Sequence, residues 1–282
     1  MRLLRLTEVH CGPRDRVFRY SPARALSLAL AVLGASAALV LVARRGSSNL
    51  AYYFAVVSPL CLLLMRRFIL ARFRPSNWLV RMNDDGLFVQ FRSYLNYHLP
   101  AEDLTVVFIP NREIRSARLV RERVTVPDEQ HSSSERCQRL IELELGADPA
   151  ELAKALAEEC ARRASAEPRW YGSTSTLYQH YPVRMAPPCA VQIEWNVVPG
   201  PQTFLDGLPR FVAIAPPVTL SQDFTHLEVL SREEQEDRLR ALVRAGRKID
   251  AIYVARRLYG NDLDRATAFV EGLTAAAGTG RP

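Results

Sequence analysis

Two long apolar runs stand close together near the start of the chain. Residues 25–43 contain no charged side chain, and neither do residues 50–65, where Pro59 is the one helix-breaking residue. A helix over the first run is roughly 28 Å long, close to the thickness of the hydrocarbon core of a bilayer. Arginines flank both runs: Arg24, Arg44, Arg45, Arg66 and Arg67. This pattern predicts a transmembrane hairpin of two α-helices over residues 25–71.

The apolar runs also allow two other interpretations. Residues 35–37 (Ala-Ser-Ala) have the small-x-small form of a signal-peptidase site. However, the first run continues to residue 43 and a second run follows, which favours membrane spans over a cleaved signal. A buried helical hairpin of a soluble protein is the other alternative, but soluble helices usually carry a polar face and these do not.

The distribution of arginines predicts the orientation of the hairpin. Six arginines lie in residues 1–24, two in the loop 44–49 and five in residues 66–81. The positive-inside rule then places both termini in the cytoplasm of a bacterium, with residues 1–24 as a basic tail and the chain in the inner membrane. Attraction to anionic lipid makes four arginines candidate head-group contacts, or residues that only set the topology: Arg66, Arg67, Arg72 and Arg74.

From residue 77 onward the period of the hydrophobic pattern changes to that of β-strands. Residues 78–82 and 86–91 read as two strands joined at an Asp-Gly turn, and residues 104–109 read as a third. Residues 113–126 fit one long strand or a bent pair. Residues 140–145 alternate apolar and acidic side chains, as a strand with one wet face does.

A helix is expected to close this β-rich region. Asp148 is the expected N-cap, Pro149 lies in the first turn and Glu151 follows three residues after the cap. Residues 77–165 are therefore predicted to be an antiparallel β-rich domain with a C-terminal helix. This order of elements resembles the bacterial pleckstrin-homology-like domains found behind membrane hairpins, and the resemblance implies a domain of that fold.

A second β-rich segment is predicted over residues 181–230, after a linker at 165–181. Residues 191–195 alternate as a half-buried strand, and residues 211–214 read as a short buried strand. Prolines cut the segment into short pieces. The pattern leaves open whether the segment completes the first β-rich domain or forms one of its own.

Residues 231–273 predict a small module of three helices. Ser231 and Glu234 form a capping box, a helix follows to residue 245, and Gly260 joins two further helices at a left-handed C-cap position. The final pair resembles the helix-turn-helix part of the C-terminal domain of the ribosomal stalk protein. The resemblance is carried by Lys248-Ile249, Ala251-Ile252, Arg256, Gly260, Leu263, Ala266 and Val270-Glu271.

In the stalk family a lysine-rich face of this motif binds translation factors. Tyr253 and Thr267 stand here at two of those lysine positions, while Arg256 is retained. The resemblance thus implies a helical module for contacts with another protein, with packing on the β-rich region as the alternative. The candidate partner-binding residues are Ile252, Tyr253, Arg256 and Phe269.

Charge and chemistry narrow the function class. The net charge of +7 follows from arginines near the membrane segment, so it indicates topology and not nucleic-acid binding. The five cysteines include no C-x-x-C pair, and the histidines have no metal-ligand spacing. Neither a P-loop nor a G-x-G-x-x-G fingerprint occurs, and no catalytic site, cofactor or metal is expected.

The fold class expected from the sequence is a membrane α-helical hairpin plus a cytoplasmic α+β part. We expect a non-enzymatic, inner-membrane-anchored protein with the lipid bilayer and a protein as partners, acting as an interaction or scaffold module. The alternatives are a membrane-bound enzyme with a dispersed active site and an accessory subunit of a membrane complex.

Overall fold

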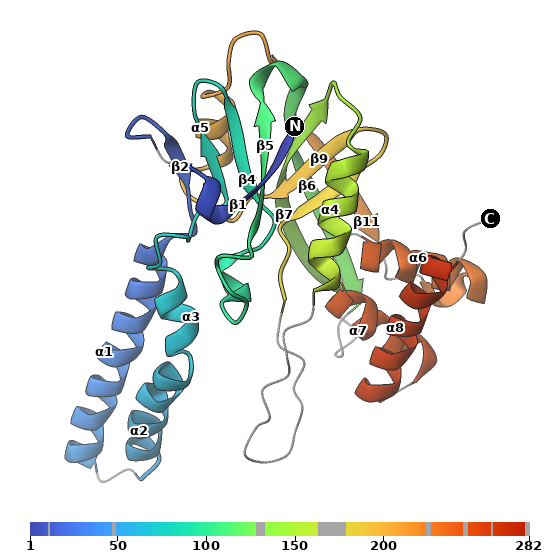
Figure 1. Cartoon of the computed structure of the whole chain (residues 1–282). Helices are drawn as coiled ribbons and strands as arrows, with labels where there is room; N and C mark the ends of the chain where they lie inside the picture. Colours follow the sequence, from blue (N-terminus) through green and yellow to red (C-terminus); the bar gives the residue numbers. More distant parts are fainter. Residues whose placement is uncertain are drawn as a thin grey trace. The chain divides into compact units, whose positions relative to one another are not determined.

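The protein has an α+β fold, seen in a computed structural model that describes residues 1–10, 12–46, 49–127, 133–162, 179–223, 227–244, 248–260 and 262–279 (Figure 1). The chain divides into two compact units. Unit 1 consists of Met1–Arg115, Glu144–Val183 and Asn196–Ala213. Unit 2 consists of Ser116–Leu143, Arg184–Trp195 and Ile214–Pro282.

The apolar runs of unit 1 are helical. Helices α1 (Pro22–Gly46) and α2 (Asn49–Leu64) contact each other and lie side by side in Figure 1, and the short helix α3 (Arg66–Ala71) follows α2. Among the described residues one helix, over Pro22–Arg44, is long and apolar enough to cross a membrane by length and composition. Helix α2 is shorter, at 16 residues, and contains Pro59.

An antiparallel sheet of five strands forms the β part of unit 1, in the order β1-β5-β4-β3-β2. Its register pairs Val80 with Val89 and Phe88 with Phe108. The three strands predicted between residues 78 and 109 are present in this sheet. The strands are β1 (Arg2–Arg5), β2 (Arg16–Phe18), β3 (Val80–Met82), β4 (Gly86–Gln90) and β5 (Thr105–Pro110).

The first residues of the chain were expected to be a basic tail, and the structure differs. Strand β1 pairs with β5 and strand β2 pairs with β3, so this segment supplies both edges of the sheet. Phe18 is 1 % exposed and its ring packs edge-on against Phe204, with 5.4 Å between ring centroids. Phe18 of β2 is buried by this pairing, whereas Leu3 of β1 stays 44 % exposed at the edge of the sheet.

The turn between β3 and β4 contains a glycine at a point where the neighbouring strand leaves no room for a β-carbon. Asn83 Oδ1 accepts hydrogen bonds from Asp85 N (3.1 Å) and Gly86 N (2.8 Å), which closes the turn. A β-carbon on Gly86 would lie 2.3 Å from the backbone oxygen of Ile109 on β5. Gly86 does not have a positive φ angle, so close approach of the next strand explains the glycine here.

Shorter helices complete unit 1. Helix α4 begins at Ala150, two residues after the predicted cap, and Asp148 Oδ1 still accepts from Ala150 N at 3.0 Å. The other helical segments are the 3-10 helices η1 (Leu6–Glu8), η2 (Tyr94–Asn96) and η3 (Asn111–Glu113), with α4 (Ala150–Ala161) and α5 (Pro201–Leu205).

A second sheet, most of it in unit 2, has the strand order β10-β6-β7-β9-β8, and β11 pairs in parallel with β6. Residues 183–194 thus share a sheet with residues 114–145. The prediction of a buried strand at 211–214 is wrong in its burial, because Phe211 is 67 % exposed and Ile214 is 50 % exposed at the sheet edge. The strands are β6 (Ile114–Pro127), β7 (Ser133–Leu145), β8 (Val183–Ala186), β9 (Ala190–Glu194), β10 (Ala213–Ile214) and β11 (Val218–Asp223).

Three helices follow in unit 2 after the 3-10 helix η4 (Leu227–Val229), namely α6 (Arg232–Arg244), α7 (Lys248–Tyr259) and α8 (Leu263–Thr279). Leu239, Val254 and Val270 from the three helices are buried in one shared cluster. Gly260 has φ of 62°, as predicted for a left-handed cap. Most of the linker predicted at 165–181 lies outside the described residues.

Candidate functional site

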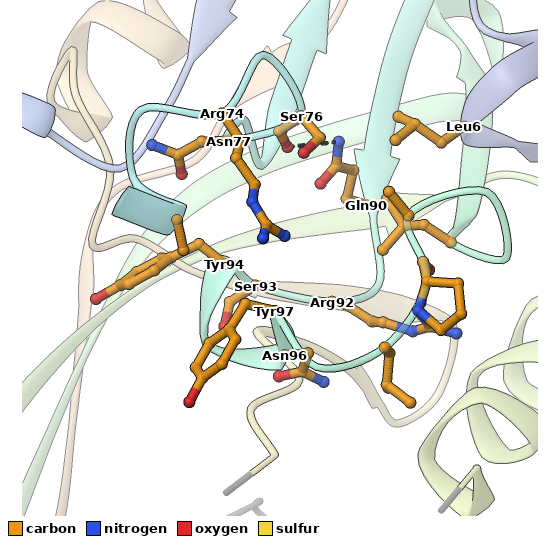
Figure 2. Close-up of a pocket in the computed structure, with 15 residues that line it drawn as sticks. Leu6, Arg74, Ser76, Asn77, Gln90, Arg92, Ser93, Tyr94, Asn96 and Tyr97 are labelled. Carbon is orange, nitrogen blue, oxygen red and sulfur yellow. Dashed lines mark hydrogen bonds between the residues drawn. The ribbon is translucent and has the colours of Figure 1, made fainter. Parts of the chain in front are cut away.

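A small polar cavity of about 50 Å³ lies in unit 1 where the chain leaves α3 and enters the sheet. We call it the Arg74 cavity. It has room for a few water-sized groups. Figure 2 shows the Arg74 side chain extending into the space between Gln90 and Tyr94. The residues lining it are Leu6, Ala71, Arg74, Ser76, Asn77, Gln90, Arg92, Ser93, Tyr94, Asn96, Tyr97, Leu99, Pro100, Ala101 and Leu104.

Two aromatic contacts fasten α3 to the wall of the cavity. Arg72 Nη2 donates to Tyr94 Oη at 2.6 Å, and the guanidinium carbon lies 4.7 Å from the centre of the same ring. The ring of Phe68 packs edge-on against Tyr97 at 5.1 Å. Because Tyr94 begins η2 and Tyr97 directly follows it, these contacts fix the end of α3 against η2.

Asn77 closes the side of the cavity nearest the helices. Its Nδ2 donates to the backbone oxygen of Tyr20 at 2.9 Å and to that of Arg72, which fixes the orientation of the amide. Its Oδ1 is buried and has no hydrogen-bond partner, and the residue is 5 % exposed. This oxygen is closed off from solvent, and a buried acceptor without a partner is costly.

Asn96 leaves a hydrogen-bond donor unpaired, whereas Asn77 leaves an acceptor unpaired. Its Oδ1 accepts from His180 N at 2.8 Å, which leaves Nδ2 as the donor. That nitrogen is buried without a hydrogen-bond partner, and the residue is 4 % exposed. The Ser93 hydroxyl nearby accepts from Leu95 N at 3.2 Å and can still donate.

Of the two arginines that line the cavity, Arg92 is paired with a carboxylate and Arg74 is not. Arg92 is 3 % exposed and its Nε forms an ion pair with Glu159, whose second oxygen accepts from Thr105 Oγ1 at 2.7 Å. Arg74 is exposed, and within the described part of the chain its side chain has no ion pair or hydrogen bond. The described lining includes no carboxylate. The cavity therefore carries one uncompensated positive charge.

The structure separates the four arginines proposed as head-group contacts. Arg66 and Arg67 are exposed on α3. Arg72 is half-buried and held by Tyr94. Arg74 is the member that lines the cavity. The polar residues that complete the cavity, Asn77 and Asn96, were not found from the sequence, because each reads as an ordinary turn residue.

The four partner-binding candidates of the C-terminal helices fall in two groups. Ile252, Tyr253 and Phe269 are partly buried and pack against the shared hydrophobic cluster of α6–α8. The Phe269 ring also packs on Tyr259, with 5.1 Å between centroids. Arg256 is exposed. Three of the four residues thus contribute to the cohesion of the helices.

A second polar cluster lies on the sheet of unit 2. Arg118 Nε donates to Glu142 at 2.6 Å, and Gln192 Nε2 donates to the other oxygen of Glu142 at 2.6 Å. Arg184 bridges Gln192 and Glu122, at 2.8 and 3.0 Å. Each charge is paired within the cluster, so it cross-links strands and offers no unsatisfied group to a ligand.

Titratable groups near α4 do not form a nucleophilic site. Partial burial of the thiol and the negative charge of Glu159 raise the pKa of Cys160 to about 11. Desolvation raises the pKa of Tyr181 to about 12. Both groups are protonated at neutral pH. Among the residues that the structure describes, no group of three His, Cys, Asp or Glu side chains could hold a metal ion.

In comparisons with known proteins, the chain matched no protein-family model, no characterised protein and no solved structure. The resemblances to pleckstrin-homology-like domains and to the ribosomal stalk motif stay predictions.

Proposed function

We propose that this chain is a non-catalytic binding protein anchored in a bilayer by the α1–α2 hairpin. Its sheets and C-terminal helices would lie on one side of the membrane and bind other molecules there. The location we propose is the bacterial inner membrane, with both termini in the cytoplasm.

The observation that carries this proposal is the exposure of the apolar side chains of α1. Only 11 % of the apolar window of α1 is buried. A continuous apolar surface of this size is unfavourable in water and favourable in lipid. The exposed side chains, each 48–60 % accessible, are Leu26, Leu28, Leu30, Leu33, Leu41 and Val42.

Helices α2 and α3 together give the length for a second crossing. Met65 N donates to Cys61 O at 2.9 Å, and Ile69 N donates to Met65 O at 3.2 Å. These helical hydrogen bonds continue across the boundary between α2 and α3. Arg66 and Arg67 then fall near one end, from which long side chains reach the head groups.

A protein partner is proposed for the C-terminal helices α6–α8. The stalk-like sequence pattern supports it, together with exposed apolar side chains at Leu263 (60 %) and Val229 (84 %). A protein partner would bury these two side chains in the contact, because the centre of a protein–protein interface is enriched in apolar surface.

Topology reporters test the anchor. Alkaline phosphatase fused after Gly46 should be active, because that loop is expected to lie outside the cytoplasm. Alkaline phosphatase fused after Pro75 or Pro282 should be inactive, and green fluorescent protein fused at the same two positions should fluoresce. The full chain should also stay in the membrane pellet after alkaline carbonate extraction. Leu33→Arg should release a fraction of it, because a charge at the helix centre costs about 2.5–3.5 kcal/mol of insertion. Extraction of the parent chain into the soluble fraction would contradict the proposal.

A further inference from the structure

We propose that one side of the segment 66–74 binds the surface of an anionic bilayer through the phosphate groups of its lipids. The exposed residues of this side, which we call the α3 surface, are Arg66, Arg67, Leu70, Phe73 and Arg74. The inference deepens the proposed function, on which it rests for the presence of a bilayer, by naming the class of lipid.

The opposite side of α3 is already occupied by contacts within unit 1. Ala71 is 2 % exposed. The ring of Phe68 packs against Tyr97, and Arg72 Nη2 donates to Tyr94 Oη at 2.6 Å. Because these contacts hold one side of the helix against η2, the α3 surface faces away from η2.

The helical path continues past the end of α3, so the α3 surface is one patch. Phe73 N donates to Leu70 O at 3.0 Å, and Arg74 N donates to Ala71 O at 3.4 Å. With about 3.6 residues per turn, the five residues of the α3 surface fall within about 120° of the helix circumference. The segment therefore presents its basic and apolar side chains in the same direction.

The α3 surface is positively charged and lacks counter-charges. Arg66, Arg67 and Arg74 are exposed, and among the residues that the structure describes none of them forms an ion pair. Residues 16–83 contain ten arginines and no Asp or Glu. Guanidinium groups bind phosphate oxygens with charge-assisted hydrogen bonds, and basic residues beside a membrane span attract anionic lipid. The charge of this segment thus selects an anionic partner.

The apolar members of the α3 surface favour lipid over a soluble anion. Leu70 is 61 % exposed and Phe73 is 51 % exposed. Helix α3 also contacts both α1 and α2, so it lies beside the proposed hairpin (Figure 1). A free phosphate would leave both apolar side chains in water. A bilayer surface buries them among the head groups, while the long arginine side chains reach the lipid phosphates.

The test uses the full chain purified in an uncharged maltoside detergent. Phosphatidylglycerol and phosphatidylcholine are titrated separately, and native mass spectrometry counts the bound lipids. One triple variant removes the charges of the α3 surface: Arg66→Gln/Arg67→Gln/Arg74→Gln. A second keeps them as lysines at the same positions. The matched control removes three exposed arginines of unit 1 on β1, η3 and β6: Arg2→Gln/Arg112→Gln/Arg115→Gln.

We expect the parent chain to bind phosphatidylglycerol at least about tenfold more tightly than phosphatidylcholine. The glutamine variant of the α3 surface should lose this preference. The control should change it less than about twofold, because its charges lie outside the α3 surface. The lysine variant should keep the preference within about threefold, since ammonium groups also attract anionic lipid.

Four results would overturn the inference. Equal affinities of the parent chain for the two lipids would leave the α3 surface to an acidic protein. Displacement of phosphatidylglycerol by an equal concentration of inorganic phosphate would assign the surface to a soluble anion. An equal loss in the control would mean attraction to the net charge of the chain. A loss in the lysine variant as large as in the glutamine variant would mean that the substitutions damage the helix.

The membrane anchor fails or stands separately from this inference, because lipid preference is measured in detergent. If alkaline carbonate extracts the parent chain while the α3 surface keeps its preference for phosphatidylglycerol, the anchor fails and the surface is a peripheral lipid contact. If the chain stays in the membrane pellet and binds the two lipids equally, the anchor stands and the inference fails.

Discussion

The side chains of Arg92 and Glu159 form an ion pair that is almost completely buried, with exposed fractions of 3 % and 1 %. Arg92 lies two residues after the end of β4 and Glu159 lies on α4, so the pair fastens the helix to the first sheet. Arg92 also donates to the backbone oxygen of Pro100 at 3.2 Å.

Removing one member of this pair should destabilise unit 1. Glu159→Ala leaves a buried guanidinium without its counter-charge, which costs about 3–5 kcal/mol. Thermal unfolding in detergent would show it. Glu158→Ala on the exposed face of α4 is the matched control and should change stability by less than about 0.5 kcal/mol. The double variant Arg92→Leu/Glu159→Leu should recover much of the loss, and a loss as large as that of Glu159→Ala would contradict the electrostatic explanation.

Gly86→Ala should destabilise the first sheet by about 1–3 kcal/mol, because the new β-carbon would meet the backbone oxygen of Ile109 at 2.3 Å. Gly34→Ala on α1 is the control, since a β-carbon there meets nothing within 4 Å. Denaturant titration of both variants measures the difference. Equal stability of the two variants would mean that β4 and β5 separate without cost.

Gly260→Ala should cost about 1–2 kcal/mol through backbone strain alone, because φ is 62° and a β-carbon meets no atom within 4 Å. Gly260→Val should cost more. Gly272→Ala in the interior of α8 should instead stabilise by about 1 kcal/mol. Limited proteolysis reports both changes. If Gly260→Val still captures the same proteins from solubilised membranes as the parent chain, the C-terminal helices are not the contact surface.

The first turn of α6 should loosen in acid. Hydrogen bonds from the hydroxyl (2.8 Å) and backbone N–H (3.0 Å) of Ser231 lower the pKa of Glu234. A lowered folded-state pKa stabilises above the unfolded pKa, and the benefit is lost as the pH falls through the folded value. Hydrogen exchange corrected for intrinsic rates should therefore show weaker protection of α6 below about pH 4. Glu234→Gln should remove this dependence and Glu233→Gln should keep it.

The local sequence pattern alone determined several elements. The α1 and α2 helices, the β3–β4 hairpin, the Ser231–Glu234 capping box and the left-handed Gly260 were all predicted. Each depends on residues within a few positions of one another, where periodicity, capping and turn chemistry act. For the same reason the apolar character of α1 was evident before its exposure was known.

Only the tertiary structure decided which distant segments pair. It made the start of the chain both edges of the first sheet, joined residues 183–194 to the sheet of β6 and β7, and placed Glu159 against Arg92. It also brought Arg74, Asn77 and Asn96 around one cavity and left an amide oxygen and an amide N–H without partners. Strand pairing and buried polar contacts depend on which groups meet across long sequence separations, and that information is absent from any short window of residues.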